Sequence, residues 1–242
     1  MSQTPVTRDH PAHWLPPEES TGEHELKFVL PEARAASALA WMQRVCRRDP
    51  SHPVSTVSTV YYDTPRLTRL DEKLNSDYLK TKIRLRWYDA PGVSAGGVHL
   101  EVKERIGALR RKVREPVDLN AGDLALLPLH SPVFHDVLVR LRPLGFDPAA
   151  LRPVFLIRYE RHRFIDATGA RASLDRNLRI VRVNAQAVPR VAPLPVGTAV
   201  VEIKGREEQL PRGLEGLLRL GLRQTSFSKF AVCYLELMRL KA

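Results

Sequence analysis

Much of the chain alternates polar and apolar residues with the period of two that is typical of β-strands with one buried face. The clearest segment is 80–88, in which positions 80, 82, 84 and 86 are lysine or arginine. The positions between them are held by Ile83, Leu85 and Trp87. One face of this strand is therefore wholly cationic.

Similar alternation predicts six further strands, at residues 23–28, 99–105, 110–116, 155–165, 171–183 and 200–204. Three of these strands mix acid and base on one face: Glu23, Glu25 and Lys27; Glu101, Lys103 and Arg105; Glu202 and Lys204. Any one of them alone would be a half-buried strand with its charges in water. As a set of about seven or eight strands, they indicate a sheet whose charged face is shared.

Helical periodicity predicts helices at about 32–48, 121–142, 211–220 and 226–240. Their apolar stripes need cover, and the strands offer one apolar face to provide it. The expected fold is α+β: an antiparallel, eight-stranded, tunnel-like β-barrel with a charged lumen and helices packed outside. Burying so many cations costs several kcal/mol per ion unless they are compensated. The lumen therefore predicts a polyanionic ligand, with the glutamates offsetting charge or holding a divalent metal.

Composition sharpens this picture. The 242 residues carry a formal charge of +11, which favours acidic partners. Cys46 and Cys233 lack the CxxC spacing of a zinc site, and no apolar run approaches the roughly 20 residues that cross a bilayer. A cytoplasmic protein without membrane insertion is expected. Residues 1–22 are predicted to be a disordered leader, residues 23–242 a single domain, and residues 91–97 a hairpin loop.

Common nucleotide and hydrolase motifs are absent from the sequence, including GxxxxGK[ST], GxGxxG, HExxH and GxSxG. Histidines such as His24, His99 and His162 lack metal-ligand spacing. Phosphate would therefore have to be held by side chains. The run Tyr61-Tyr62-Asp63-Thr64-Pro65 is interpreted as structural, because Asp and Pro favour a turn at the end of a strand.

Glu23-x-Glu25-x-Lys27 resembles the ExExK signature of the triphosphate tunnel metalloenzymes, the CYTH-like superfamily. Within that superfamily the chain resembles VTC domains, the polyphosphate polymerase module of the vacuolar transporter chaperone complex. The resemblance spans about residues 23–232. It rests on an ordered set of segments, at residues 61–65, 83–88, 101–103, 113–115, 171–178, 202–204 and 226–230.

The resemblance implies the roles of particular residues. The implied phosphate contacts are Lys27, Arg84, Arg86, Lys103, Arg114, Arg161, Arg171 and Lys229, with Lys204 as a further contact. The implied catalytic residues are Lys103, Arg84, Arg86 and Glu202. Glu202 is the implied ligand of Mn²⁺ or Mg²⁺, which favour carboxylate and phosphate oxygens, with Glu25, Glu101 or Glu23 as partners. Arg158 or Arg163 could replace Arg161 in another strand register. Lys103 is expected at the centre of the lumen and Lys229 near a tunnel mouth.

The resemblance also implies an activity, the transfer of the γ-phosphoryl group of ATP to a growing inorganic polyphosphate chain. A first alternative keeps the fold and uses water as acceptor, giving a triphosphatase or tripolyphosphatase. A second is a non-enzymatic polyanion-binding protein. Nucleic acid is not expected, because Trp14, Trp41, Trp87 and Tyr88 do not interleave with the basic strand face. A membrane-protein partner and the oligomeric state are left open.

Overall fold

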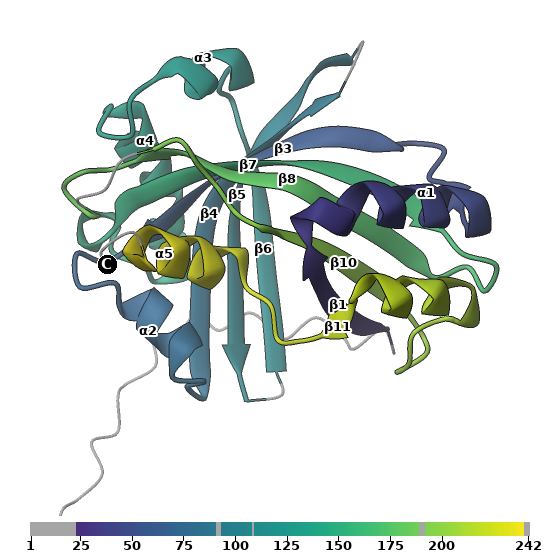
Figure 1. Ribbon diagram of the computed structural model, residues 1–242. Coiled ribbons are helices and arrows are strands. Elements are labelled where there is room, and N and C mark those ends of the chain that lie inside the picture. Colours follow the sequence, from purple (N-terminus) through teal and green to yellow (C-terminus); the bar gives the residue numbers. More distant parts are fainter. Residues whose placement is uncertain (1–22, 91–92, 108, 189–191, 240–242) are drawn as a thin grey trace, which may run out of the picture.

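The computed structural model describes residues 23–90, 93–107, 109–188 and 192–239 (Figure 1). The expected leader, residues 1–22, lies outside this part of the chain. Eight strands form the body of the fold: β1 (His24–Pro31), β3 (Val54–Asp63), β4 (Leu79–Ala90), β5 (Val93–Ile106), β6 (Leu109–Val117), β7 (Arg152–Ile165), β8 (Arg171–Val183) and β10 (Thr198–Gly205). Three two-residue strands extend it: β2 (Arg47–Arg48), β9 (Leu194–Pro195) and β11 (Arg223–Gln224).

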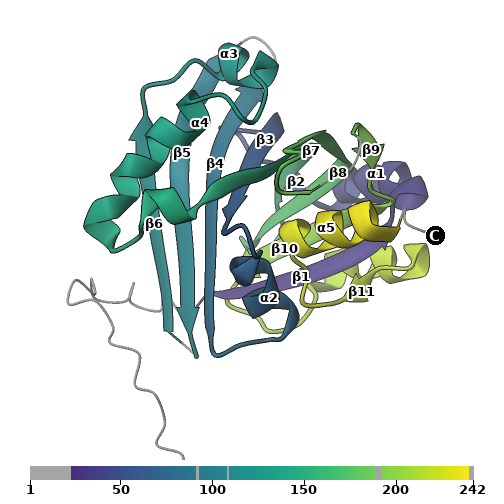
Figure 2. The same cartoon turned by 90° about the vertical axis from the view of Figure 1, so that its left-hand side faces the viewer.

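All strands belong to one antiparallel sheet, whose order is β11-β1-β10-β8-β7-β3-β4-β5-β6. The sheet is strongly curled, so that β4, β5 and β6 stand on one side of the molecule and β1 and β10 cross on the other (Figure 2). Within the described residues no backbone pairing joins β6 to β1 or β11. The sheet is therefore a tunnel-like barrel that hydrogen bonds leave open along one seam.

The apolar side of the alternation lies on the convex face, beneath helices. Ile83, Leu85 and Trp87 are fully buried, and their cluster includes residues of α3 (Ala121–Leu126), α4 (Val133–Asp136) and η2 (Val137–Leu144). A second cluster places Phe28 and Val201 under α1 (Ala35–Val45) and η4 (Arg212–Leu220). The short turns η1 (Glu32–Arg34) and η3 (Pro148–Ala150) complete these connections. The predicted α+β fold with charges on the concave side is confirmed.

One helix departs from the expected arrangement. Helix α5 (Lys229–Arg239) packs on the concave side, where Phe230 stacks on Tyr61 with ring centroids 4.9 Å apart. Tyr61 pairs directly with Arg84, and residues directly opposite in an antiparallel pair share a face. Helix α2 (Thr68–Leu74) joins the same cluster through Leu70. The concave side thus has an apolar end closed by α5, and the remainder is charged.

Three sequence-based expectations need adjustment. The single helix predicted at 121–142 is wrong, because Pro128 and Pro132 interrupt it and leave three short elements. Strand β3 was not among the segments predicted by alternation, since it is buried on both faces. The predicted hairpin at 91–97 is tighter than expected, because Val93 already pairs with Ala90; residues 91–92 lie outside the described residues.

The longest helices, α1 and α5, have 11 residues each. Crossing a bilayer takes about 20. None of the described helices is long and apolar enough to do so.

Candidate active site on the concave face

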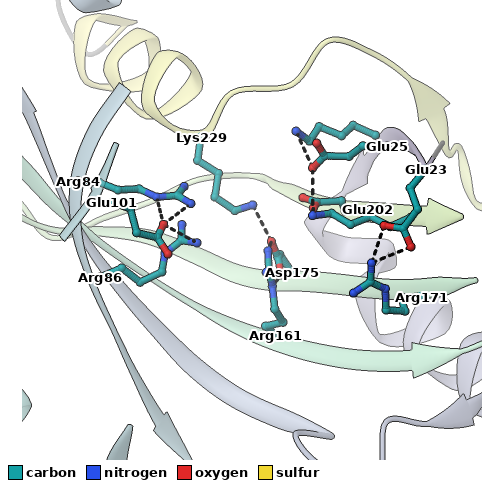
Figure 3. Close-up of polar contacts among 12 residues, drawn as sticks. Glu23, Glu25, Arg84, Arg86, Glu101, Arg161, Arg171, Asp175, Glu202 and Lys229 are labelled. Atoms are coloured by element: carbon teal, nitrogen blue, oxygen red, sulfur yellow. Dashed lines mark hydrogen bonds and ion pairs between the residues drawn. The ribbon is translucent and has the colours of Figure 1, made fainter. Parts of the chain in front are cut away.

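The first charged cluster is centred on Glu101 of β5, whose side chain is 4% exposed. The Arg84 side chain donates a 2.6 Å hydrogen bond from Nε to Glu101 Oε2. Arg86 lies 3.7 Å from the same oxygen (Figure 3). Arg114 lies 3.6 Å from Oε1. Burial raises the pKa of Glu101, but the three guanidinium groups outweigh it and hold the pKa at about 2. Glu101 therefore remains a carboxylate and orients three arginines.

The second cluster is centred on Asp175 of β8, which is 1% exposed. Arg161 donates two hydrogen bonds to its carboxylate, of 2.6 and 2.7 Å, and Lys229 donates a third of 2.6 Å (Figure 3). Burial raises the pKa of Asp175, but the two cations outweigh it and lower the pKa below its usual value. Asp175 thus joins the first residue of α5 to strand β7.

This cluster resolves the register of β7. Arg161 pairs with Asp175 and lies on the concave side, whereas Arg158 donates to Ser58 from the opposite face of the strand. Arg163 shares the face of Arg161 and donates to Ser55. The implied position, Arg161, therefore lies on the charged face.

The third cluster combines β1 and β10. Glu202 pairs with Lys27 across the strands, and Glu25 pairs with Lys204. Lys27 Nζ lies 3.1 Å from Glu25, and Lys204 Nζ lies 3.6 Å from Glu202 and 3.9 Å from Glu25. Burial raises the pKa of Glu202, but a hydrogen bond shared with Glu25 and the nearby cations Arg161 and Lys27 hold it well below its usual value.

Glu25 and Glu202 are the carboxylates that fit a divalent metal. They lie side by side and are largely buried, an arrangement that a hard cation between their oxygens would stabilise. Among the described residues no group of three or more protein ligands could hold a metal, so substrate phosphate and water would complete its coordination. Glu101 is already held by three arginines, and Glu23 forms a hydrogen-bonded ion pair with Arg171 at 2.7 Å. Their proposed role beside the metal has less geometric support.

Two neighbouring lysines carry no carboxylate partner. Lys82 and Lys103 pair in register across β4 and β5, and no ion pair within 4 Å joins either to an acidic residue of the described chain. Among the described residues, the Lys82 ammonium group donates a side-chain hydrogen bond only to Ser228, at 3.2 Å. Burial and the charge of Arg84 together lower the pKa of Lys103 to about 8, although the charge of Glu25 opposes them. Burial and the charges of Arg84 and Lys27 lower the pKa of Lys82 well below its usual value.

Exposure separates deep from peripheral cations. The side chains of Arg171, Arg114 and Lys204 are 60%, 42% and 40% exposed, whereas that of Lys229 is 10% exposed. The expectation that Lys229 lies near a tunnel mouth is therefore wrong. The apolar side of α5 packs into the concave face and carries its first residue inward.

Lys82, Asp175 and Ser228 were missed as individual site residues. Lys82 belongs to the cationic strand face, so alternation could have identified it. Asp175 and Ser228 lie within segments of the family resemblance, but their role depends on contacts between strands that the sequence does not specify.

The comparisons with known proteins agree with this geometry. The family named VTC domain matches residues 22–129 and 146–238. No curated protein sequence matches the chain. Among solved structures, an adenylyl cyclase candidate from Hippeastrum, HpAC1, superposes with a TM-score of 0.51 at 16% identity, covering 88% of this chain and 96% of its own. An adenylate cyclase candidate from Bacillus halodurans superposes with a TM-score of 0.50 at 13% identity, covering 92% and 100%.

At such low identities the two structures show a shared fold and no more. This fold is that of the triphosphate tunnel metalloenzymes. The family match spans most of the chain, including all three charged clusters. This protein is accordingly a member of the VTC domain family.

Proposed function

We propose that this protein is a divalent-metal-dependent polyphosphate polymerase, which transfers the γ-phosphoryl group of ATP to the end of an inorganic polyphosphate chain. One observation carries the proposal. On the concave face of this VTC domain, the buried carboxylates of Glu101 and Asp175 hold the surrounding arginines and lysine in place. Such a surface is preorganised for a chain of phosphates. Lys82 and Lys103 form no ion pair within 4 Å with a carboxylate of the described residues, and this supports placing the phosphoryl group beside them.

The chemistry needs no protein nucleophile. A terminal oxygen of the polyphosphate acceptor attacks the γ-phosphorus, the bond from this phosphorus to the β–γ bridging oxygen breaks, and ADP leaves. Arg84 and Arg86 are oriented by Glu101 and offer planar donors to phosphate oxygens. Lys103 stabilises charge that develops on the transferring group. Glu202 and Glu25 would hold Mn²⁺ or Mg²⁺, which would neutralise phosphate charge.

Peripheral cations have a different role in this proposal. Arg171, Arg114 and Lys204 are exposed enough to meet the substrate as it enters or the polymer as it leaves. Both cysteines are free, which fits a reducing compartment such as the cytoplasm.

The test is incubation with ATP labelled at the γ-phosphate, with Mn²⁺ or Mg²⁺, followed by separation of products on a gel. A ladder of labelled polymer together with ADP supports the proposal. Glu202→Gln keeps the shape of the side chain and removes its charge, so it should abolish the ladder.

A triphosphatase is the second candidate. The Hippeastrum protein that shares the fold is described as having a dominant triphosphatase activity. Release of labelled orthophosphate without polymer would favour this candidate. Binding of polyphosphate with no turnover of ATP at any metal concentration would favour a non-enzymatic polyanion-binding protein.

A further inference from the structure

A second basic surface lies outside the tunnel, on the face formed by α1, β2 and η4. Within residues 33–48 and 212–220 the exposed charged side chains are one glutamate, Glu215, and six arginines: Arg34, Arg44, Arg47, Arg48, Arg212 and Arg219. No ion pair within 4 Å joins any of these arginines to a carboxylate of the described residues. The two helical elements pack side by side over the convex face of the sheet (Figure 1). This surface therefore presents unpaired positive charge away from the candidate active site.

A tryptophan is fixed between these two elements. The indole N–H of Trp41 donates to the backbone oxygen of Gly213 at 3.0 Å. A Cβ atom at Gly216 would lie 2.3 Å from the Trp41 ring, so glycine is needed for the ring to lie against η4. Trp41 nevertheless remains 38% exposed, and Leu218, two residues after Gly216 on η4, is 53% exposed. The fold thus holds an aromatic ring at the surface.

Arginines flank this ring on both elements. Arg44 follows Trp41 by three residues on α1, which places it on the same side of the helix. Arg219 follows Gly216 by three residues on the 3₁₀ element η4, where residues three apart are stacked. The surface consequently combines a fixed tryptophan, an exposed leucine and several cations.

We infer that the α1–η4 face docks onto a lipid bilayer that contains anionic phospholipids. Arginines attract anionic headgroups, and tryptophan favours the boundary between headgroups and acyl chains. A soluble polyanion such as polyphosphate has no apolar part for Trp41 and Leu218. Single-stranded nucleic acid is bound in basic grooves lined by several aromatic rings, whereas this face is convex and has one. The inference does not depend on the proposed enzymatic activity.

Tryptophan fluorescence tests the contact directly. In a Trp14→Phe variant of the full chain, the remaining tryptophans are Trp41 and the fully buried Trp87. Vesicles of equal parts phosphatidylglycerol and phosphatidylcholine should shift the emission to shorter wavelength, and vesicles of phosphatidylcholine alone should not. An unchanged emission spectrum with both kinds of vesicle would overturn the inference.

Co-sedimentation with the same vesicles assigns the surface. Each arginine near an anionic membrane changes binding by about fivefold, so Arg44→Gln/Arg219→Gln should weaken binding by on the order of 20-fold. The matched control, Arg140→Gln/Arg142→Gln, removes the same charge from η2 and should bind like the wild type. Leu218→Gln should weaken binding severalfold without loss of charge. If the two double-arginine variants lost vesicle binding equally, or if Leu218→Gln bound like the wild type, the attraction would be a general one between positive protein and negative vesicle. Either result would overturn the inference.

Discussion

At the residue scale, Lys82 of β4 and Lys103 of β5 lie opposite each other. Burial and nearby cations disfavour their charged forms, and the proposed function gives both lysines a phosphate to bind. Alternation predicts that Lys82 and Arg84 share one face, and the structure agrees. Their different surroundings could not be predicted from the sequence. Arg84 lies opposite Glu101, whereas Lys82 lies opposite Lys103, and this depends on strand register. Lys82 is therefore a partly buried cation with no carboxylate of the described residues within 4 Å, and under the proposed function the phosphates of the substrate supply its counter-charge.

Lys82→Met should make the ligand-free protein more stable and its ligand binding weaker. Replacing a buried, unpaired charge by an apolar side chain should raise the free energy of unfolding at pH 7 by on the order of 1 kcal/mol. For a chain of this size that is about 2–4 °C in melting temperature. Loss of a hydrogen bond from the charged lysine should weaken tripolyphosphate binding by on the order of tenfold. Thermal unfolding and titration calorimetry measure the two effects.

The exposed Arg140 of η2 is the control, because Arg140→Met removes the same charge from a solvated position away from the lysine pair. Its melting temperature should match that of the wild type. A Lys82→Met protein that is less stable than the wild type would show that Lys82 has an internal partner and would contradict this account.

Under the proposed function, Lys103 should make phosphate binding dependent on pH. Because burial and the charge of Arg84 lower its pKa to about 8, the side chain is charged below this pH and loses its charge as the pH rises through it. Tripolyphosphate affinity should therefore fall between pH 7 and pH 9. Lys103→Arg keeps its charge throughout this range, so its affinity should fall less.

Titration calorimetry of the wild type and Lys103→Arg at several pH values measures this difference. The ionisation of tripolyphosphate affects both proteins equally, so any difference between their pH profiles comes from residue 103. Identical pH profiles for the wild type and Lys103→Arg would exclude Lys103 as the titrating group.

At the element scale, α5 shows where sequence reasoning fails and why. Its apolar stripe predicts a helix at 226–240, and α5 begins at Lys229. The apolar stripe alone does not predict which face of the sheet the helix packs against. That side is decided by Tyr61 and Phe155, which lie on the concave face of β3 and β7 and need an apolar cover. The ion pair from Lys229 to Asp175 then fixes the start of the helix.

Asp175→Asn should loosen α5. The substitution removes the carboxylate that Arg161 and Lys229 both contact, and breaking such a buried pair typically costs about 3–5 kcal/mol. Amides of α5 should exchange with deuterium faster than in the wild type, by more than amides of α1. The control is Glu236→Gln, which removes an exposed pair with Arg239 on the same helix and should change little. Unchanged protection of α5 in Asp175→Asn would show that apolar packing alone holds the helix.

Asp63 performs a comparable task for α2. Its carboxylate accepts backbone hydrogen bonds from Thr64, Arg69 and Leu70, which fixes the turn between β3 and the helix. Asp63→Ala should lower the free energy of unfolding by about 1–3 kcal/mol, because buried N–H groups lose their acceptor. Asp71→Ala, at an exposed position of α2, is the control and should stay within about 0.5 kcal/mol of the wild type. Urea unfolding compares them, and equal stabilities would contradict the structural role of Asp63.

At the scale of the whole molecule, the segment before α5 links strand β1 to α2 and β4 across the concave side of the sheet. The Thr225 N–H donates to the backbone oxygen of Lys27 on β1 at 3.0 Å. Ser226 accepts from Lys73 of α2 at 3.0 Å, and Ser228 accepts from Lys82 of β4. The segment therefore connects the two sides of the curled sheet beside the lysine pair. Alternation predicts a charged face, but the bridge is a set of long-range contacts that periodicity cannot reveal.

The central claim is that this concave face holds the phosphates of the substrate. A crystal structure of the protein with tripolyphosphate and Mn²⁺ tests it most directly. We expect phosphate density between Lys82, Lys103 and Arg84, and a metal peak at Glu25 and Glu202. Tripolyphosphate bound only on the convex face, with Lys82 and Lys103 free of ligand, would contradict the account.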